Sequence, residues 1–202
     1  AEQVIEEVLN VYRPFAAAHS ATISMEPDWE SQSGAIGAFV RQVRRWVVEP
    51  RGSLLKPYLT RDVMRLLACH EMGHFFGGFP FKTATQPPTP DLTNFGTFSA
   101  AEGQSDYFAA KNCLRRVWAG NRDNAAFRWL IAAESRSRCD AVWRHPGDRD
   151  ICYRSFFVAH DFARWLQNLP NPTLSVDTPD RTVIAKTTPS YGSQQCRIDT
   201  VV

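Results

Sequence analysis

The chain has 202 residues, of which 44% are hydrophobic and 22% are charged, and its formal net charge is +2 at pH 7. This composition supplies enough apolar material for a core and excludes a mostly disordered chain. The even charge balance gives no reason to expect nucleic acid or an anionic membrane as the main partner, and no apolar run approaches the roughly 18 residues of a membrane span. We therefore expect one domain over residues 1–202.

The beginning of the chain predicts a helix followed by strands. Apolar residues at helical spacing predict an amphipathic helix over residues 2–19. Alternation over 21–25 and a run rich in Val, Phe and Trp over 36–48 predict two strands. Arginines interrupt the second run, which suits a strand at the exposed edge of a sheet.

A second helix is predicted over residues 61–76. Thr60 is a suitable N-cap, Asp62 lies in the first turn, where a negative charge is favourable, and Gly77 and Gly78 end the helix. This helix closes a first part of the domain, residues 1–78, made of helix, sheet and helix.

The second part of the domain, residues 79–202, is predicted to be mostly helical. Residues 79–97 contain four prolines and predict a surface loop. Periodic apolar residues then predict three helices, over about 99–118, 123–144 and 150–168. The tail from Pro170 predicts loop or a short strand. A small sheet followed by helices makes the fold class α+β.

Five cysteines bear on the cellular compartment. Cys139 and Cys152 flank a polar loop that a disulfide could close, and we predict that bridge. Disulfides need an oxidising compartment, which favours a secreted or periplasmic protein. The alternative is a cytosolic chain with five buried thiols. The odd number leaves at least one cysteine without a partner in the chain.

The chemistry is concentrated in the sequence His70-Glu71-Met72-Gly73-His74. Residues i and i+4 of an α-helix lie about 40° apart around the axis and roughly 6 Å apart along it, so both histidines can reach one zinc ion. Glu71 lies one step further round the helix, as a general base needs to do to take a proton from zinc-bound water. The alternative is two histidines that merely share a helix face.

A catalytic zinc needs three protein ligands and one open position. The extended form of the motif would place a third histidine at position 80, but Pro80 has no ligand atom. Cys69 points about 100° away from His70 around the helix and is a poor candidate.

Glu102 is the better candidate for the third ligand. It and Asp106 are at positions i and i+4 of the next predicted helix and share a face. Asp106 can then hydrogen-bond the far nitrogen of a ligand histidine, which fixes the orientation of the ring. Two alternatives remain: Ser99 and Glu102 could form a capping box without a metal, and Asp106 could be a solvated helix residue.

These motifs resemble the gluzincin class of zinc metallopeptidases. The similarity lies in His70–Pro80 (HEMGHFFGGFP), Glu102–Cys113 (EGQSDYFAAKNC) and the tail segment Gln195–Thr200. The amino-acid sequences of these segments are similar to those of a group of exported bacterial gluzincin-like proteins. The resemblance implies a thermolysin-like catalytic core, with an antiparallel sheet before the active-site helix and an edge strand beside the substrate cleft.

Carried over to this sequence, the resemblance implies a role for each motif residue. His70, His74 and Glu102 would bind one zinc ion, Glu71 would act as the general base, and Asp106 would be the partner of His70.

A peptidase also needs a donor for the negative oxygen of the tetrahedral intermediate. The candidates are Tyr107, His145, His160 and Tyr191, and we name Tyr191 because its Pro-Ser-Tyr-Gly turn could fold over the cleft. A separate group of arginines could attract acidic substrates or form a solvated strand face: Arg41, Arg44, Arg45 and Arg51.

The sequence thus predicts a zinc-dependent metallopeptidase, an endopeptidase acting on proteins or peptides. Two alternatives stay open. One is a catalytically silent zinc-binding scaffold that acts as a binding module, and the other is a zinc amidase with a non-peptide substrate.

Overall fold

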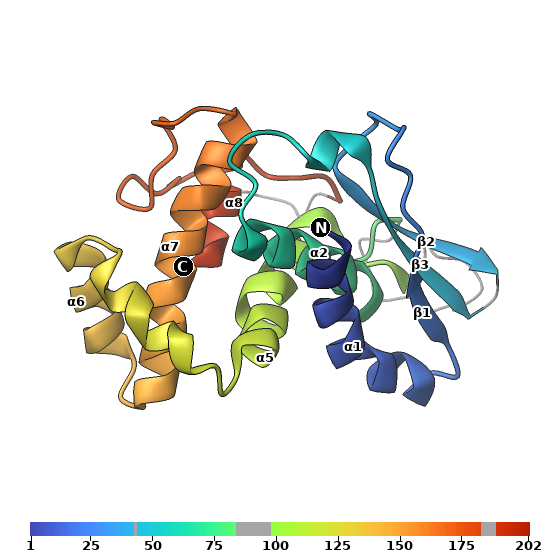
Figure 1. Cartoon of the computed structure of the whole chain (residues 1–202), viewed down its shortest axis with the longest axis horizontal. Helices are drawn as coiled ribbons and strands as arrows, with labels where there is room; N and C mark the ends of the chain where they lie inside the picture. Colours follow the sequence, from blue (N-terminus) through green and yellow to red (C-terminus); the bar gives the residue numbers. More distant parts are fainter. Residues whose placement is uncertain (43, 84–97, 183–188) are drawn as a thin grey trace.

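The computed structural model describes residues 1–42, 44–83, 98–182 and 189–202. The described residues form an α+β fold with a small mixed sheet at one end and helices over the rest (Figure 1). The helices are α1 (Glu2–Ala18), α2 (Arg61–Phe76), α4 (Glu102–Phe108), α5 (Leu114–Trp118), α6 (Ala133–Val142), α7 (Pro146–Gln167) and α8 (Gln194–Val201). Most of the loop predicted over 79–97 lies outside the described residues.

The sheet has three strands in the order β1-β3-β2: β1 (Thr22–Met25), β2 (Ile36–Gln42) and β3 (Arg45–Pro50). The antiparallel sheet that we expected is wrong, because β1 pairs with β3 in parallel and only β2 and β3 are antiparallel. The single strand predicted over 36–48 is also wrong. Arg44 adopts a left-handed backbone with φ of 67°, which belongs to a turn and divides the run into a hairpin.

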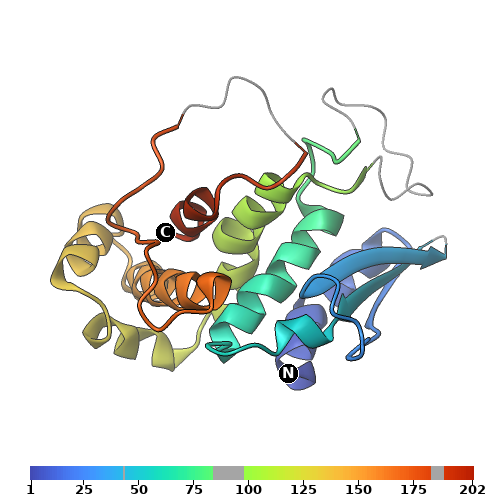
Figure 2. The same ribbon diagram turned by 90° about the horizontal axis from the view of Figure 1, so that it is seen from above.

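Helix α2 is the centre of the fold. It spans the predicted residues, and the hydroxyl of Thr60 accepts a hydrogen bond from the backbone N–H of Val63 at 3.3 Å, as a helix cap does. Nearly every residue of α2 is buried, which is typical of a helix surrounded by other elements. Figure 2 shows α2 with the sheet on one side and α7 with the C-terminal tail on the other.

Helix α4 packs very closely against α2. A Cβ atom added to Gly73 of α2 would lie 2.6 Å from the Cα atom of Ser105 in α4, so only glycine allows this approach. The helix begins at Glu102 with Ala101 as its N-cap, rather than near Ser99. The capping box that we considered for Ser99 and Glu102 therefore does not form. A π-helical segment, Ala109–Cys113, joins α4 to α5.

The second half of the chain differs from the prediction in two places. The helix predicted over 123–144 is divided into a 3-10 helix, Arg122–Trp129, and α6. The tail, predicted as loop or strand, ends in α8, where the hydroxyl of Ser193 accepts from the N–H of Cys196 at 3.0 Å. Only eight residues long, α8 depends on packing against α7 and α4 rather than on its own helical propensity.

Two disulfides tie the helices together. Cys139–Cys152 confirms the predicted bridge. Cys69–Cys113, which we did not predict, joins α2 to the π-helical segment. Cys196 is the free cysteine of the described residues. Two disulfides fit an extracellular location. Within the ranges that the structure describes, no helix combines the length and apolarity needed to cross a membrane.

Candidate metal centre

The two histidines of α2 face each other with their rings nearly perpendicular and their ring centroids 4.8 Å apart. Asp106 holds the Nδ1 atom of His70 at 2.7 Å. The Nδ1 atom of His74 lies 2.8 Å from the carbonyl oxygen of Ala100 and 2.8 Å from the hydroxyl of Ser105. When Nδ1–H donates to such acceptors, Nε2 presents its lone pair, which is the usual arrangement of a histidine that binds a metal.

Glu71 lies beside the two rings. One of its carboxylate oxygens is 4.0 Å from Nε2 of His74, and the side chain is almost fully buried. The candidate ligand atoms of His70, Glu71 and His74 all lie within 4.8 Å of one another. These three residues could therefore hold a metal ion.

Glu102 reaches the same place from α4. Its Oε2 atom lies 3.0 Å from Nε2 of His70 and 3.4 Å from Nε2 of His74, while Oε1 contacts the ammonium of Lys82 at 2.9 Å. Although burial favours the neutral acid, hydrogen bonds with both imidazoles hold the pKa of Glu102 well below its usual range. The Nε2 atoms of His70 and His74 together with the Oε2 atom of Glu102 form a donor set that suits Zn²⁺.

Asp106 connects this cluster to the C-terminal helix. The guanidinium of Arg197, in α8, donates to both carboxylate oxygens of Asp106 at 2.9 and 3.0 Å. Burial opposes ionisation of Asp106, but His70 and Arg197 lower its pKa. Burial likewise opposes the charged form of His70, yet Asp106 with the nearby glutamates raises the pKa of His70 to about 9. Arg197 had no sign in the sequence beyond its place in the tail segment of the resemblance.

Tyr191 lies next to His70, as the prediction of a turn over the cleft requires. Its hydroxyl is 3.4 Å from Nε2 of His70, and the two rings stack with centroids 5.7 Å apart. The guanidinium of Arg197 lies over the Tyr191 ring, 4.2 Å from its centroid. Burial, followed by the charge of Glu102, raises the pKa of Tyr191, so the phenol stays a proton donor at neutral pH.

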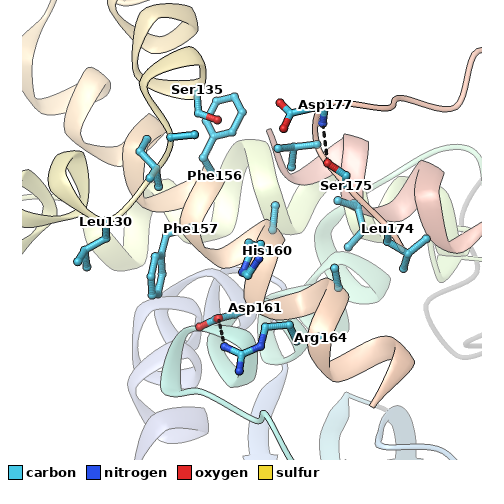
Figure 3. Close-up of a pocket in the computed structure, with 16 residues that line it drawn as sticks. Leu130, Ser135, Phe156, Phe157, His160, Asp161, Arg164, Leu174, Ser175 and Asp177 are labelled. Atoms are coloured by element: carbon cyan, nitrogen blue, oxygen red, sulfur yellow. Dashed lines mark hydrogen bonds and ion pairs between the residues drawn. The ribbon is translucent and has the colours of Figure 1, made fainter. Parts of the chain in front are cut away.

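The other candidate donors lie elsewhere. Tyr107 is 54% exposed, and His145 precedes the first residue of α7 as its N-cap. His160 lines a separate cavity of about 420 Å³ beside α7, shown in Figure 3, whose lining includes none of the candidate metal ligands. Apolar side chains such as Phe156 and Leu174 make most of its wall, and Asp161 pairs with Arg164 at one end.

A cleft of about 480 Å³ opens directly onto the candidate metal centre, with His70 and Glu71 in its lining. The start of β2 forms one side, and the end of α7 and the tail form the other. The remaining lining residues are Gln32, Gly34, Ala35, Ile36, Ser53, Lys56, Leu67, Trp165, Leu166, Tyr191, Gln194 and Arg197. Ile36, the first residue of β2, lines this cleft, and β2 is an edge strand of the sheet in the described part of the chain.

Comparison of the chain with protein-family models, with curated proteins and with solved structures finds no match. The case for a function therefore depends on the site residues themselves.

Proposed function

We propose that this protein is a zinc-dependent peptidase of the gluzincin class with a thermolysin-like catalytic core. One observation carries the proposal: Glu102 of α4 lies within 3.4 Å of the Nε2 atoms of both His70 and His74 of α2, with the Glu71 carboxylate beside them. Such convergence from two helices is the arrangement that the spacing of the motifs predicts. Two disulfides support a secreted or periplasmic location.

Each side chain has a role in peptide hydrolysis. A divalent ion, when bound, supplies Lewis acidity toward water and the scissile carbonyl. The carboxylate of Glu71 accepts the proton of the attacking water and returns it to the leaving amine. The hydroxyl of Tyr191 donates to the negative oxygen of the transition state. Asp106 fixes the ring of His70, and the carbonyl of Ala100 fixes that of His74.

The cleft favours a peptide over a non-peptide amide as the substrate. Its wall includes Ile36 at the start of β2, an edge strand among the described residues, and a strand that adds to a sheet edge is recognised through its backbone, as peptides are. An amidase acting on a small molecule would not need such an edge.

The alternative of a silent metal-binding module keeps one supporting observation. The ammonium of Lys82 pairs with Glu102, so in this arrangement a cation of the protein already neutralises one proposed ligand. A module of this kind would bind zinc without hydrolysing any peptide.

Zinc analysis and a peptide library together test the proposal. We expect one zinc per chain, and Glu71→Gln should keep that zinc while lowering kcat by at least about 100-fold, because it removes the base. Glu102→Ala should lower the zinc content strongly. The exposed Glu134→Gln, in α6, serves as the matched control. A wild type that binds zinc fully and cleaves no library peptide would establish the silent module, and unchanged zinc in Glu102→Ala would remove Glu102 from the site.

A further inference from the structure

Lys56 differs from the other cations near the metal cleft because it lacks a carboxylate partner. Among the described residues no acidic side chain forms an ion pair with it, and burial alone lowers its pKa. Three arginines of the sheet region do have carboxylate partners: Arg41 and Arg51 pair with Glu49, and Arg45 pairs with Glu26. Lys56 is thus a partly buried ammonium without an anion beside it in the described part of the chain.

The ammonium of Lys56 is held in place by an aromatic ring. Its Nζ atom lies 4.0 Å from the centroid of Trp165, at the end of α7. Trp165 is itself fixed, since its indole N–H donates to the carbonyl of Leu54 at 3.3 Å and its ring stacks on Phe162. In Figure 1 the loop after the 3-10 helix Gly52–Leu54 passes beside this end of α7. A cation–π contact orients a lysine without consuming its charge.

The charges that line the cleft favour an anionic guest. Apart from the candidate metal ligand His70, the charged lining residues in the described part of the chain are Lys56, Arg197 and Glu71. Arg197 gives its donors to Asp106, and Glu71 belongs to the metal centre. Lys56 is therefore the one lining cation whose charge is still available, and it stands beside apolar contacts from Trp165 and Leu166.

We propose that the metal cleft selects peptides with an acidic side chain near the cleaved bond, and that Lys56 binds the carboxylate of that side chain. The inference rests on the proposed function, because it names the substrate class of the same site. A glutamate is well suited, since its two methylene groups can lie against the apolar wall while its carboxylate meets the ammonium.

The test uses fluorogenic peptides that differ only in one residue, Glu, Gln or Lys, placed in turn at two positions on each side of the cleaved bond. For zinc-loaded wild type we expect kcat/KM about five- to tenfold higher for the best Glu peptide than for its Gln counterpart. Lys56→Met keeps an apolar chain over Trp165 and should reduce that ratio to about one. Lys56→Arg should retain the preference.

Lys111→Met is the matched control, because it removes the same charge on the π-helical segment, away from the cleft lining. It should leave the Glu-to-Gln ratio unchanged. Equal rates for Glu and Gln peptides at every position, or a preference that survives in Lys56→Met, would overturn the proposal.

A binding measurement separates this inference from the proposed function. The same peptides are titrated by fluorescence anisotropy against Glu71→Gln and against Glu71→Gln combined with Lys56→Met. If no peptide is cleaved by wild type but Glu peptides bind selectively and only when Lys56 is present, the peptidase proposal fails and the acidic subsite stands. Binding without any Glu selectivity refutes the subsite whether or not hydrolysis occurs.

Discussion

A buried Arg–Asp pair lies beside each half of α2, and the two pairs have different consequences. Near the N-terminus, Arg154 of α7 donates to both oxygens of Asp62 at 2.9 and 2.7 Å. Beside the C-terminal half, Arg197 of α8 donates to both oxygens of Asp106 at 2.9 and 3.0 Å. Among the described residues the hydrogen bonds of the Asp62 carboxylate come from arginines, whereas the Asp106 carboxylate also contacts the ring of His70.

The difference shows that the role of a buried Arg–Asp pair depends on the further partner of its carboxylate, which for Asp106 is the candidate metal ligand His70. The Asp62 pair joins α2 to α7, and the side-chain oxygen of Asn124 also accepts from Arg154. These contacts of Arg154 hold elements of the fold together and do not involve the candidate metal ligands. The Asp106 pair fixes the tautomer of a candidate ligand. Replacing a member of each pair should therefore affect different measured quantities.

Arg154→Ala should cause the larger loss of stability. It leaves the buried Asp62 carboxylate with Arg65 alone, and breaking a buried pair costs about 3–5 kcal/mol. Chemical denaturation would measure the loss, and zinc affinity of the remaining folded protein should be unchanged. A variant as stable as wild type would show that the pair contributes nothing to the joining of α2 and α7.

Asp106→Asn should act mainly on the metal. Loss of a carboxylate that orients a ligand histidine typically lowers metal affinity about 10- to 100-fold, and the isosteric amide preserves packing. Competition with a zinc chelator would measure the affinity, with Asp62→Asn as the matched control at the other end of α2. An equal decrease in both variants would contradict the functional distinction between the pairs.

The pH dependence of the metal-free protein should be the smallest effect. Despite burial, Asp106 raises the pKa of His70 to about 9, above the ordinary value near 6.5. The protonated ring therefore contributes stability that is fully present below pH 6.5 and is lost as the pH rises through about 9. Denaturation of zinc-free protein between pH 6 and 9.5 should show this decrease, and Asp106→Asn should flatten it. A stability that rises over this range would refute the assignment.

The sequence was sufficient for features that depend on neighbours along the chain. The cap of Thr60 and the spacing of His70 and His74 are local, so α2 and the direction of its histidines could be predicted. The bridge between Cys139 and Cys152 closes a short loop and could be predicted in the same way.

Features that depend on distant contacts could not be predicted. Arg197 meets Asp106 across 91 positions, and nothing near either residue indicates the other. Helix α8 and the parallel pairing of β1 likewise form only against elements far away in the chain. In the sequence Lys56 is an ordinary loop lysine, and its contact with the ring of Trp165 in α7 is seen only in the folded structure.

Gly73 has no side chain that could bind a metal or take part in a reaction, but the motif requires a glycine at this position because of the space available. Even an added methyl group would collide with the backbone of α4 and push Glu102 away from the two imidazoles. If every residue of the motif is replaced in turn and zinc retention is measured, substitutions of Gly73 should lower zinc retention as much as substitutions of the two histidines. The distance between two main chains, as much as the identity of the donors, then decides whether such a centre can be transplanted onto another scaffold.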